Sequence, residues 1–201
     1  MDPLDSVGGD EAEHEEQVAA VMERGRQQGL LDIFASIAGL TRLKSLDVTG
    51  MCHVATSIGR ASGLVPGDPC ALTVLTGLTH LDLSSSGACV DNAAAAALAH
   101  SLKEMRILGL CACELGSMAC LEAIADLPQL SDLNLRRNPG ITHRGLMALT
   151  RLSCVQSLAV TRNDEVTDAS VDDFLLDIAW SGRSSSKKYW APGNCYEIVL
   201  Q

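Results

Sequence analysis

The chain has 201 residues, of which 47% are hydrophobic and 3% aromatic, and its formal net charge is −10. This length suffices for one core, which must be built from leucine, alanine, isoleucine and valine. The sequence lacks an apolar run of about 18 residues, which excludes a membrane span, and it lacks a basic stripe, which argues against nucleic-acid binding. Its acidic beginning, from Met1 to Asp5, is unlike a targeting peptide, so we expect a cytoplasmic protein.

Residues 1–16 hold seven acidic residues and neither lysine nor arginine. Such a composition predicts a disordered acidic tail that aids solubility, and leaves open whether the tail also binds a partner. The apolar spacing over residues 17–26 then predicts a helix, which Gly29 can end.

Residues 30–43 allow two interpretations. The segment Leu30–Ile37 faintly resembles the Leu-x-x-Ile-Phe core of an F-box, the helix that recruits a ubiquitin-ligase scaffold. The four apolar residues from Phe34 to Leu43 also fall at the same positions as those from Leu121 to Leu130, in a unit that recurs along the chain. We therefore favour a helix that belongs to the first of these units or caps it.

The recurring unit has the form apolar-x-x-apolar-x-apolar-x-x-small/Asn and occurs five times. Its cleanest copies are 130–138 and 155–163, and earlier copies begin at Leu43, Leu78 and Met105. The second apolar residue of each copy advances by 35, 27, 25 and 25 residues, and three of these steps match the period of about 20–29 residues of leucine-rich repeats. The long first step predicts an insertion loop over residues 52–70, where glycine and proline gather.

Each unit contains a strand signal and a helix signal. Apolar and polar residues alternate over the last positions, as in Leu133-Asn134-Leu135, which is the period of a short strand with one buried face. Before the strand, apolar residues such as Leu121 and Ile124 recur at helical spacing. One strand and one helix cannot bury an apolar face alone, but stacked copies can. We therefore expect an α/β fold of about five strand–helix repeats around a parallel sheet.

The segment 138–146, Asn-Pro-Gly-Ile-Thr-His-Arg-Gly-Leu, and the turn at 163–168 resemble leucine-rich repeats of the cysteine-containing, ribonuclease-inhibitor-like type. The resemblance covers roughly residues 30–180 and implies a right-handed solenoid whose parallel sheet forms the concave face. It also implies that an Asn or Cys side chain after each strand bonds to backbone groups of the neighbouring turn. In this sequence the role falls on Asn138, Asn163 and Cys113, only in part on Ser86, and not on Met51.

The end of the chain departs from the repeat. A last helix is expected over Asp168–Trp180, whose early aspartates suit the helix dipole. Residues 181–188 are expected to form a polar linker and residues 196–200 a short strand that caps the sheet. The expected organisation is an acidic tail 1–16, a leucine-rich repeat domain 17–180 that includes the 52–70 loop, and a linker with a capping strand 181–201.

The sequence offers few candidates for chemistry. Its eight cysteines lack the dense spacing of a disulfide scaffold, so we expect free, mostly buried thiols. The run Cys111–Cys120 is a zinc alternative, but no second Cys/His pair has ligand spacing, so neither a metal nor another cofactor is expected. His80, Asp82 and Ser84 alternate along one strand, too far apart for a Ser–His–Asp arrangement, and the common catalytic motifs are missing. We therefore expect no enzyme.

In a leucine-rich solenoid, the residues beside the buried leucines line the concave face, which is the natural binding surface. The expected partner-binding residues are Asp47, His80, Asp82, Ser84, Asn134, Arg136 and Thr161. Any one of them can instead be an ordinary solvated strand position. We predict a non-enzymatic protein–protein interaction module, acting as a monomer or as a subunit of a hetero-complex, with a protein partner rather than nucleic acid or a membrane. Two alternatives stay open: a substrate-recognition subunit of a ubiquitin ligase, and a structural subunit of a large assembly anchored by the strand 196–200.

Overall fold

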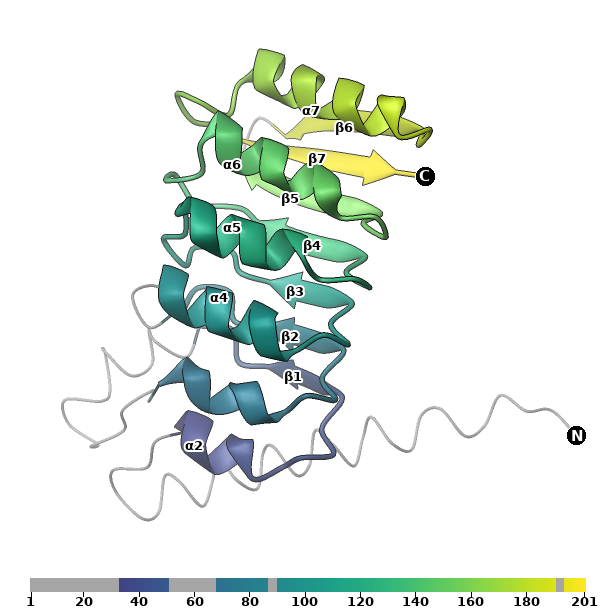
Figure 1. Cartoon of the computed structure of the whole chain (residues 1–201). Coiled ribbons are helices and arrows are strands. Elements are labelled where there is room, and N and C mark those ends of the chain that lie inside the picture. Colours follow the sequence, from purple (N-terminus) through teal and green to yellow (C-terminus); the bar gives the residue numbers. More distant parts are fainter. Residues whose placement is uncertain (1–32, 51–67, 87–89, 191–193) are drawn as a thin grey trace, which may run out of the picture.

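The computed structural model describes residues 33–50, 68–86, 90–190 and 194–201. Within them, a seven-stranded sheet forms one layer, and helices stacked along one of its faces form the other (Figure 1). The expected acidic tail, the helix over 17–26 and residues 52–67 of the insertion loop lie outside the described residues. The two layers confirm the expected α/β class.

In the described part of the chain, five strands run parallel and follow one another in chain order. They are β1 (Ser45–Asp47), β2 (His80–Asp82), β3 (Ile107–Gly109), β4 (Asp132–Leu135) and β5 (Ser157–Thr161). The register places one leucine of each strand opposite the next, in the row Leu46, Leu81, Leu108, Leu133 and Leu158. These are the second apolar residues of the five sequence copies, and all are at most 4% exposed. The common register and the helical second layer make this a leucine-rich-repeat-like fold.

Helical segments connect the strands and cover one face of the sheet (Figure 1). In chain order they are α2 (Ile33–Ala38), the 3-10 helix η1 (Pro69–Val74), α4 (Asn92–Ser101), α5 (Met118–Ala125), α6 (His143–Ala148), the 3-10 helix η3 (Leu149–Arg151) and α7 (Asp168–Trp180). The side chains of Asp91, Ser117, Thr142 and Thr167 accept a backbone hydrogen bond in the first turns of α4, α5, α6 and α7, respectively. Each of these N-caps satisfies a donor that the helix itself leaves unpaired.

The helix η1 starts earlier than the sequence indicated. Asp68 Oδ1 accepts a hydrogen bond from the backbone N–H of Cys70 at 2.8 Å. Pro69 lies in the first helical turn, where a missing N–H costs nothing. The last residues of the segment 52–70, which we expected to be loop, therefore belong to a helix.

Asn138 joins its own turn to the turn of the preceding repeat. Its side chain is fully buried. Oδ1 accepts hydrogen bonds from the backbone N–H of Cys113 at 3.1 Å and of Leu115 at 2.9 Å. Nδ2 donates to the carbonyl of Leu110 at 2.8 Å and to two carbonyls of its own turn at 3.0 and 3.2 Å. One carboxamide thus satisfies backbone groups that no strand or helix pairs.

The residues at equivalent positions follow this pattern unequally. Asn163 Nδ2 donates to two carbonyls of the preceding turn at 3.0 and 2.8 Å, and Cys113 Sγ donates to a carbonyl of the turn before its own at 3.4 Å. Ser86 Oγ is buried and has no hydrogen-bond partner among the described residues. The bonds implied by the family resemblance are therefore present for Asn138, Asn163 and Cys113 but not for Ser86, and Met51 lies outside the described residues.

The turn after each of the first four strands also repeats in its backbone. Gly50, Ser85, Ala112 and Arg137 have φ angles of 74°, 60°, 56° and 56°. This is the left-handed region, which only glycine adopts without strain. Three of the four copies therefore carry a strained residue at the same place in the turn.

The sheet ends in an antiparallel hairpin. It comprises β6 (Ser185–Trp190) and β7 (Cys195–Leu200), and β7 lies between β5 and β6. Tyr196, Ile198 and Leu200 are at most 2% exposed, so this strand closes the core at one end of the stack. Residues 185–188, expected to lie in a polar linker, form part of the edge strand β6 instead. These serine and lysine residues are exposed, as is common on an edge strand. A run of polar residues does not alternate between apolar and polar positions, so it carries no strand signal.

Candidate protein-binding surface

The open face is the side of the sheet that the helices leave uncovered (Figure 1). Side chains alternate along a strand, so the neighbours of the buried leucines point to this side. The pairing register arranges them in two rows. The first row is Asp47, Asp82, Gly109, Asn134, Ala159 and Glu197, and the second row is Ser45, His80, Ile107, Asp132, Ser157 and Val199.

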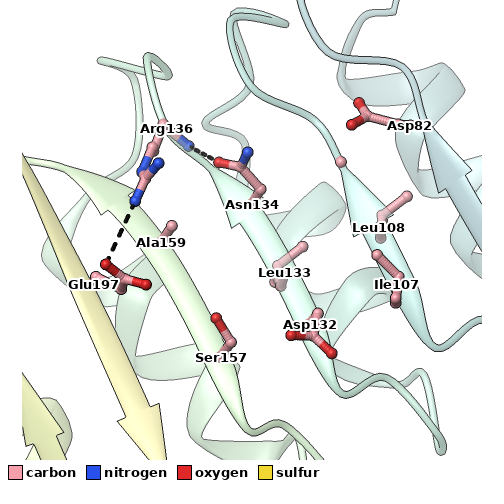
Figure 2. A pocket seen from close by; sticks show the side chains of 11 residues that line it. Asp82, Ile107, Leu108, Asp132, Leu133, Asn134, Arg136, Ser157, Ala159 and Glu197 are labelled. Atoms are coloured by element: carbon pink, nitrogen blue, oxygen red, sulfur yellow. Dashed lines mark hydrogen bonds and ion pairs between the residues drawn. The ribbon is translucent and has the colours of Figure 1, made fainter. Parts of the chain in front are cut away.

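A hollow of about 290 Å³ opens on this face (Figure 2). The hollow is deep because the first row contains Gly109, which has no side chain, and Ala159, whose side chain is a single methyl group. The hollow is lined by Asp82, Ile107, Leu108, Gly109, Asp132, Leu133, Asn134, Arg136, Ser157, Ala159 and Glu197. Residues from β2 at one side to β7 at the other thus contribute to one depression.

The Asp82 carboxylate leans from β2 over the neighbouring strand (Figure 2). A Cβ atom at Gly109 would lie 2.3 Å from Asp82 Oδ1 and 2.4 Å from its Cγ, so the carboxylate occupies the space that a side chain at this position would fill. Asp82 Oδ1 also accepts a hydrogen bond from the backbone N–H of Ser84 at 2.8 Å. The glycine therefore lets this carboxylate lie over β3.

Arg136 and Glu197 face each other at the other side of the hollow (Figure 2). Arg136 Nη2 lies 3.9 Å from Glu197 Oε2, and the two side chains are 38% and 43% exposed. An ion pair this open to solvent contributes little to stability. It does direct the guanidinium charge toward Glu197 and away from the acids on β2 and β4.

Those acids have no matching cation. Among the described residues, neither Asp82 nor Asp132 forms an ion pair with lysine, arginine or histidine. Asp132 Oδ2 accepts a hydrogen bond from the hydroxyl of Ser131 at 2.6 Å. Because Arg136 and Glu197 balance each other, the hollow keeps two uncompensated carboxylates.

The structure brings three of the seven expected partner-binding residues together. Asp82, Asn134 and Arg136 line the hollow. Asp47 and His80 are exposed on the same face but do not contribute to its lining. The predicted surface therefore contains both the hollow and an exposed margin on β1 and β2.

The other two expected residues use their hydroxyls within the fold. Ser84 is 7% exposed, and its Oγ accepts a hydrogen bond from the backbone N–H of Cys111 at 3.2 Å. Thr161 Oγ1 accepts a short hydrogen bond from the backbone N–H of Arg137. Both hydroxyls link neighbouring turns, so their side chains already have a structural use.

Asp132, Ser157 and Glu197 line the hollow but were not among the expected partner-binding residues. The alternation that selected Asn134 also places Asp132 and Ser157 on the same side of their strands, so the sequence signal was available. Glu197 joins the face because β7 pairs with β5, which sets it opposite Ala159. That pairing could not be read from the repeat.

The thiols in the described part of the chain differ in burial. Six cysteines are free there, and no group of three His, Cys, Asp or Glu residues could hold a metal ion. Burial raises the pKa of Cys113 to about 11 and that of Cys120 to about 12, so both stay protonated and unreactive near neutral pH. None of the described helices combines the length and apolarity needed to cross a membrane.

Comparison with known proteins gives limited similarity. No family model matches the sequence, and neither does any curated protein. Among solved structures, the chain is similar to the tropomodulin C-terminal domain from Caenorhabditis elegans, with a TM-score of 0.48 and 10% identity over 81% of this chain and 91% of that one. It is also similar to an internalin from Listeria monocytogenes, with a TM-score of 0.29 and 16% identity over 70% of this chain and 54% of that one. Similarity at this level does not indicate what the chain binds.

Proposed function

We propose that this chain is a non-enzymatic protein-interaction module that binds a protein partner on the open face of its sheet. The hollow carries the proposal, because it combines small, apolar and charged side chains in one depression. Ile107 at its side is 41% exposed, although it is a large apolar residue on a strand. Protein interfaces commonly centre on a side chain that one partner inserts into such a depression of the other.

The hydrogen bonds of the alternating polar residues on and directly after β2 support the non-enzymatic part of the proposal. His80 Nδ1 lies 2.7 Å from the hydroxyl of Thr79. Asp82 accepts from the backbone N–H of Ser84, and the Ser84 hydroxyl accepts from the backbone of the next turn. Each side chain is therefore engaged separately, whereas nucleophilic catalysis needs them bonded in series.

The finer architecture belongs to the same proposal. We expect about five repeats of the cysteine-containing, ribonuclease-inhibitor-like type in a right-handed solenoid with a concave open face. The buried bonds of Asn138 support the type, and crossovers between parallel strands are right-handed in nearly all proteins. We further propose a cytoplasmic monomer or hetero-complex subunit, since a reducing compartment preserves free cysteines.

The structure weighs against the two alternatives in their simplest form. Phe34, which an F-box-like helix would offer to a ligase scaffold, is 0% exposed and part of the core. In the strand 196–200, which would anchor the chain in an assembly, Tyr196, Ile198 and Leu200 pack into the core of this chain, and Val199 is 41% exposed. Phe34 is therefore not available to a ligase scaffold, and Val199 alone offers little apolar surface for an anchor.

The test adds the same bulk to the two faces of the molecule. Ser157→Phe fills the hollow without changing charge, and Ala119→Phe places the same ring on the exposed side of α5. Both full-length variants are compared with wild type by affinity capture from native lysate, after circular dichroism has shown unchanged folding. We expect a partner that wild type and Ala119→Phe retain and that Ser157→Phe loses. A partner retained by Ser157→Phe, or lost with Ala119→Phe alone, would contradict the proposal.

A further inference from the structure

We propose that the hollow receives a basic side chain, an arginine or a lysine, that protrudes from the protein partner. This inference rests on the proposed function, because it names the chemistry of the group that the open face binds. Its starting point is the charge balance of the lining, in which Arg136 faces Glu197 while Asp82 and Asp132 have no cation. A partner with a protruding cation supplies what this face lacks.

The two free carboxylates lie on either side of one position. The Asp82 carboxylate lies over Gly109 on β3. Gly109 on β3 pairs with Asn134 on the next strand, β4, and Asp132 lies two residues before Asn134 on β4. With strands about 4.8 Å apart and about 3.3 Å per residue, the Cα atoms of Gly109 and Asp132 are roughly 8 Å apart. A cation above β3 therefore lies between both carboxylates.

Each carboxylate keeps one oxygen for a ligand. Asp82 Oδ1 is engaged by the backbone N–H of Ser84, and Asp132 Oδ2 by the hydroxyl of Ser131. The second oxygen of each acid makes no hydrogen bond within the described chain. These local bonds hold the two acids in place, so a partner's N–H donors meet acceptors that are already oriented.

The rest of the lining suits the stem of such a side chain. Ile107 stands at the side and is 41% exposed, and Ala159 on β5 adds a methyl group. Arginine and lysine bury their methylene groups against apolar surface while the charged end stays near water and acids. The hollow offers both environments within about 290 Å³.

A neighbouring residue strengthens the preference for a cation. Asp47 lies directly opposite Asp82 in the register of β1 and β2, and it forms no ion pair among the described residues. Like charges at opposed positions on neighbouring strands repel each other. A bound cation relieves this repulsion, whereas an anionic group increases it.

The test titrates the full-length protein with the peptide acetyl-Gly-Ala-Arg-Ala-Gly-amide and follows backbone amide shifts by NMR. The matched probe replaces arginine by citrulline, which has nearly the same shape and no charge. We expect the arginine peptide to shift the amides of Gly109, Asn134 and Ser157, and the citrulline peptide to leave them unchanged. Asp82→Asn and Asp132→Asn should each weaken binding about fivefold, and raising the ionic strength should weaken it as well.

The variants preserve the local structure that they probe. An asparagine at position 82 can still accept from the Ser84 N–H, as Asn134 Oδ1 accepts from the Arg136 N–H in the next-but-one repeat. Glu122→Gln, on the exposed side of α5, removes the same charge from the helical side and should not change binding. Equal binding of the citrulline peptide, or an effect of Glu122→Gln as large as that of Asp132→Asn, would overturn the inference.

The outcomes separate this inference from the proposed function. If Ser157→Phe abolishes partner capture but the arginine peptide does not shift the hollow, the open face binds a partner by other chemistry and the inference is refuted alone. If the peptide binds in the hollow but Ser157→Phe retains the partner, the proposed function is refuted while the chemistry of the hollow stands.

Discussion

Asn138 provides the sharpest test of how the repeats are held together. Replacing it by alanine removes a carboxamide that is 0% exposed and makes five hydrogen bonds to backbone groups. The buried N–H groups of Cys113 and Leu115 then lose their acceptor, and water cannot reach them easily. The carbonyl of Leu110 loses a donor in the same step.

The expected loss follows from these groups. Leaving a buried donor or acceptor unpaired costs about 1–3 kcal/mol. Asn138→Ala leaves at least two such donors unpaired, the N–H groups that donate to the side-chain oxygen. We therefore expect the free energy of unfolding to fall by about 4 kcal/mol, a large share of the roughly 5–15 kcal/mol that stabilises a typical domain.

The assay is urea unfolding followed by far-ultraviolet circular dichroism, with Asn134→Ala as the matched control. Asn134 accepts one hydrogen bond, from the backbone N–H of Arg136 at 3.2 Å, and is partly exposed. Water can replace that bond, so the control should lose less than about 1 kcal/mol. The two variants remove the same carboxamide group, so the difference between their losses of unfolding free energy reports how the surroundings of positions 138 and 134 differ.

Similar losses for Asn138→Ala and Asn134→Ala would refute this reasoning. They would mean that the backbone groups around position 138 find other partners when the carboxamide is gone. A changed dependence of the unfolding free energy on urea would mean instead that the surface exposed on unfolding had changed, and comparison of the midpoints alone would then be misleading.

Three further predictions concern stability. Arg183→Met should lower the free energy of unfolding by about 2 kcal/mol, because the guanidinium donates to the carbonyls of Leu152, at 3.0 Å, and of Val155; thermal unfolding measures this. Ala112→Gly should raise it by about 0.5–1 kcal/mol by relieving a φ of 56°, whereas the same change at Ala97, inside α4, should lower it by about 1 kcal/mol. Tyr196→Phe should not destabilise the protein, because the phenol oxygen is buried without a partner among the described residues. Burial raises the pKa of Tyr196 from 10.0 to about 12, so the phenol loses its proton more easily in the unfolded chain than in the folded one. The free energy of unfolding should therefore be unaffected by this group below pH 10 and should fall as the pH rises toward 12. The Tyr196→Phe variant should lack this fall in alkaline denaturation.

Each of these has a contrary result. An unchanged melting temperature for Arg183→Met would show that its bonds are replaced by water. A loss of stability in Ala112→Gly equal to that in Ala97→Gly would show that the backbone at position 112 is not strained. A Tyr196→Phe variant that unfolds at the same alkaline pH as wild type would show that other groups cause the loss there.

The candidate site was predictable in part. Strand alternation placed Asp82, Asn134 and Arg136 on the open face, because which side a residue faces depends only on its position in the strand. Alternation could not show that the Ser84 and Thr161 hydroxyls bond to neighbouring turns, since those bonds join residues more than twenty positions apart. It also could not show that the Asp82 carboxylate lies over Gly109, because that contact joins residues of two neighbouring strands.

The sequence by itself determined the repeat, because apolar spacing within each copy is a local property that decides which residues can be buried. The leucines predicted from that spacing form one buried row across the sheet, and α7 spans Asp168–Trp180 as expected. Tertiary structure decided that β6 extends the sheet beyond the predicted capping strand and that the open face is hollow. Exposed serines and lysines in β6 carry no burial signal, and the hollow exists because strand register brings Gly109, Ala159 and Glu197 into one row from distant parts of the chain. A pattern confined to one repeat cannot encode such a neighbourhood.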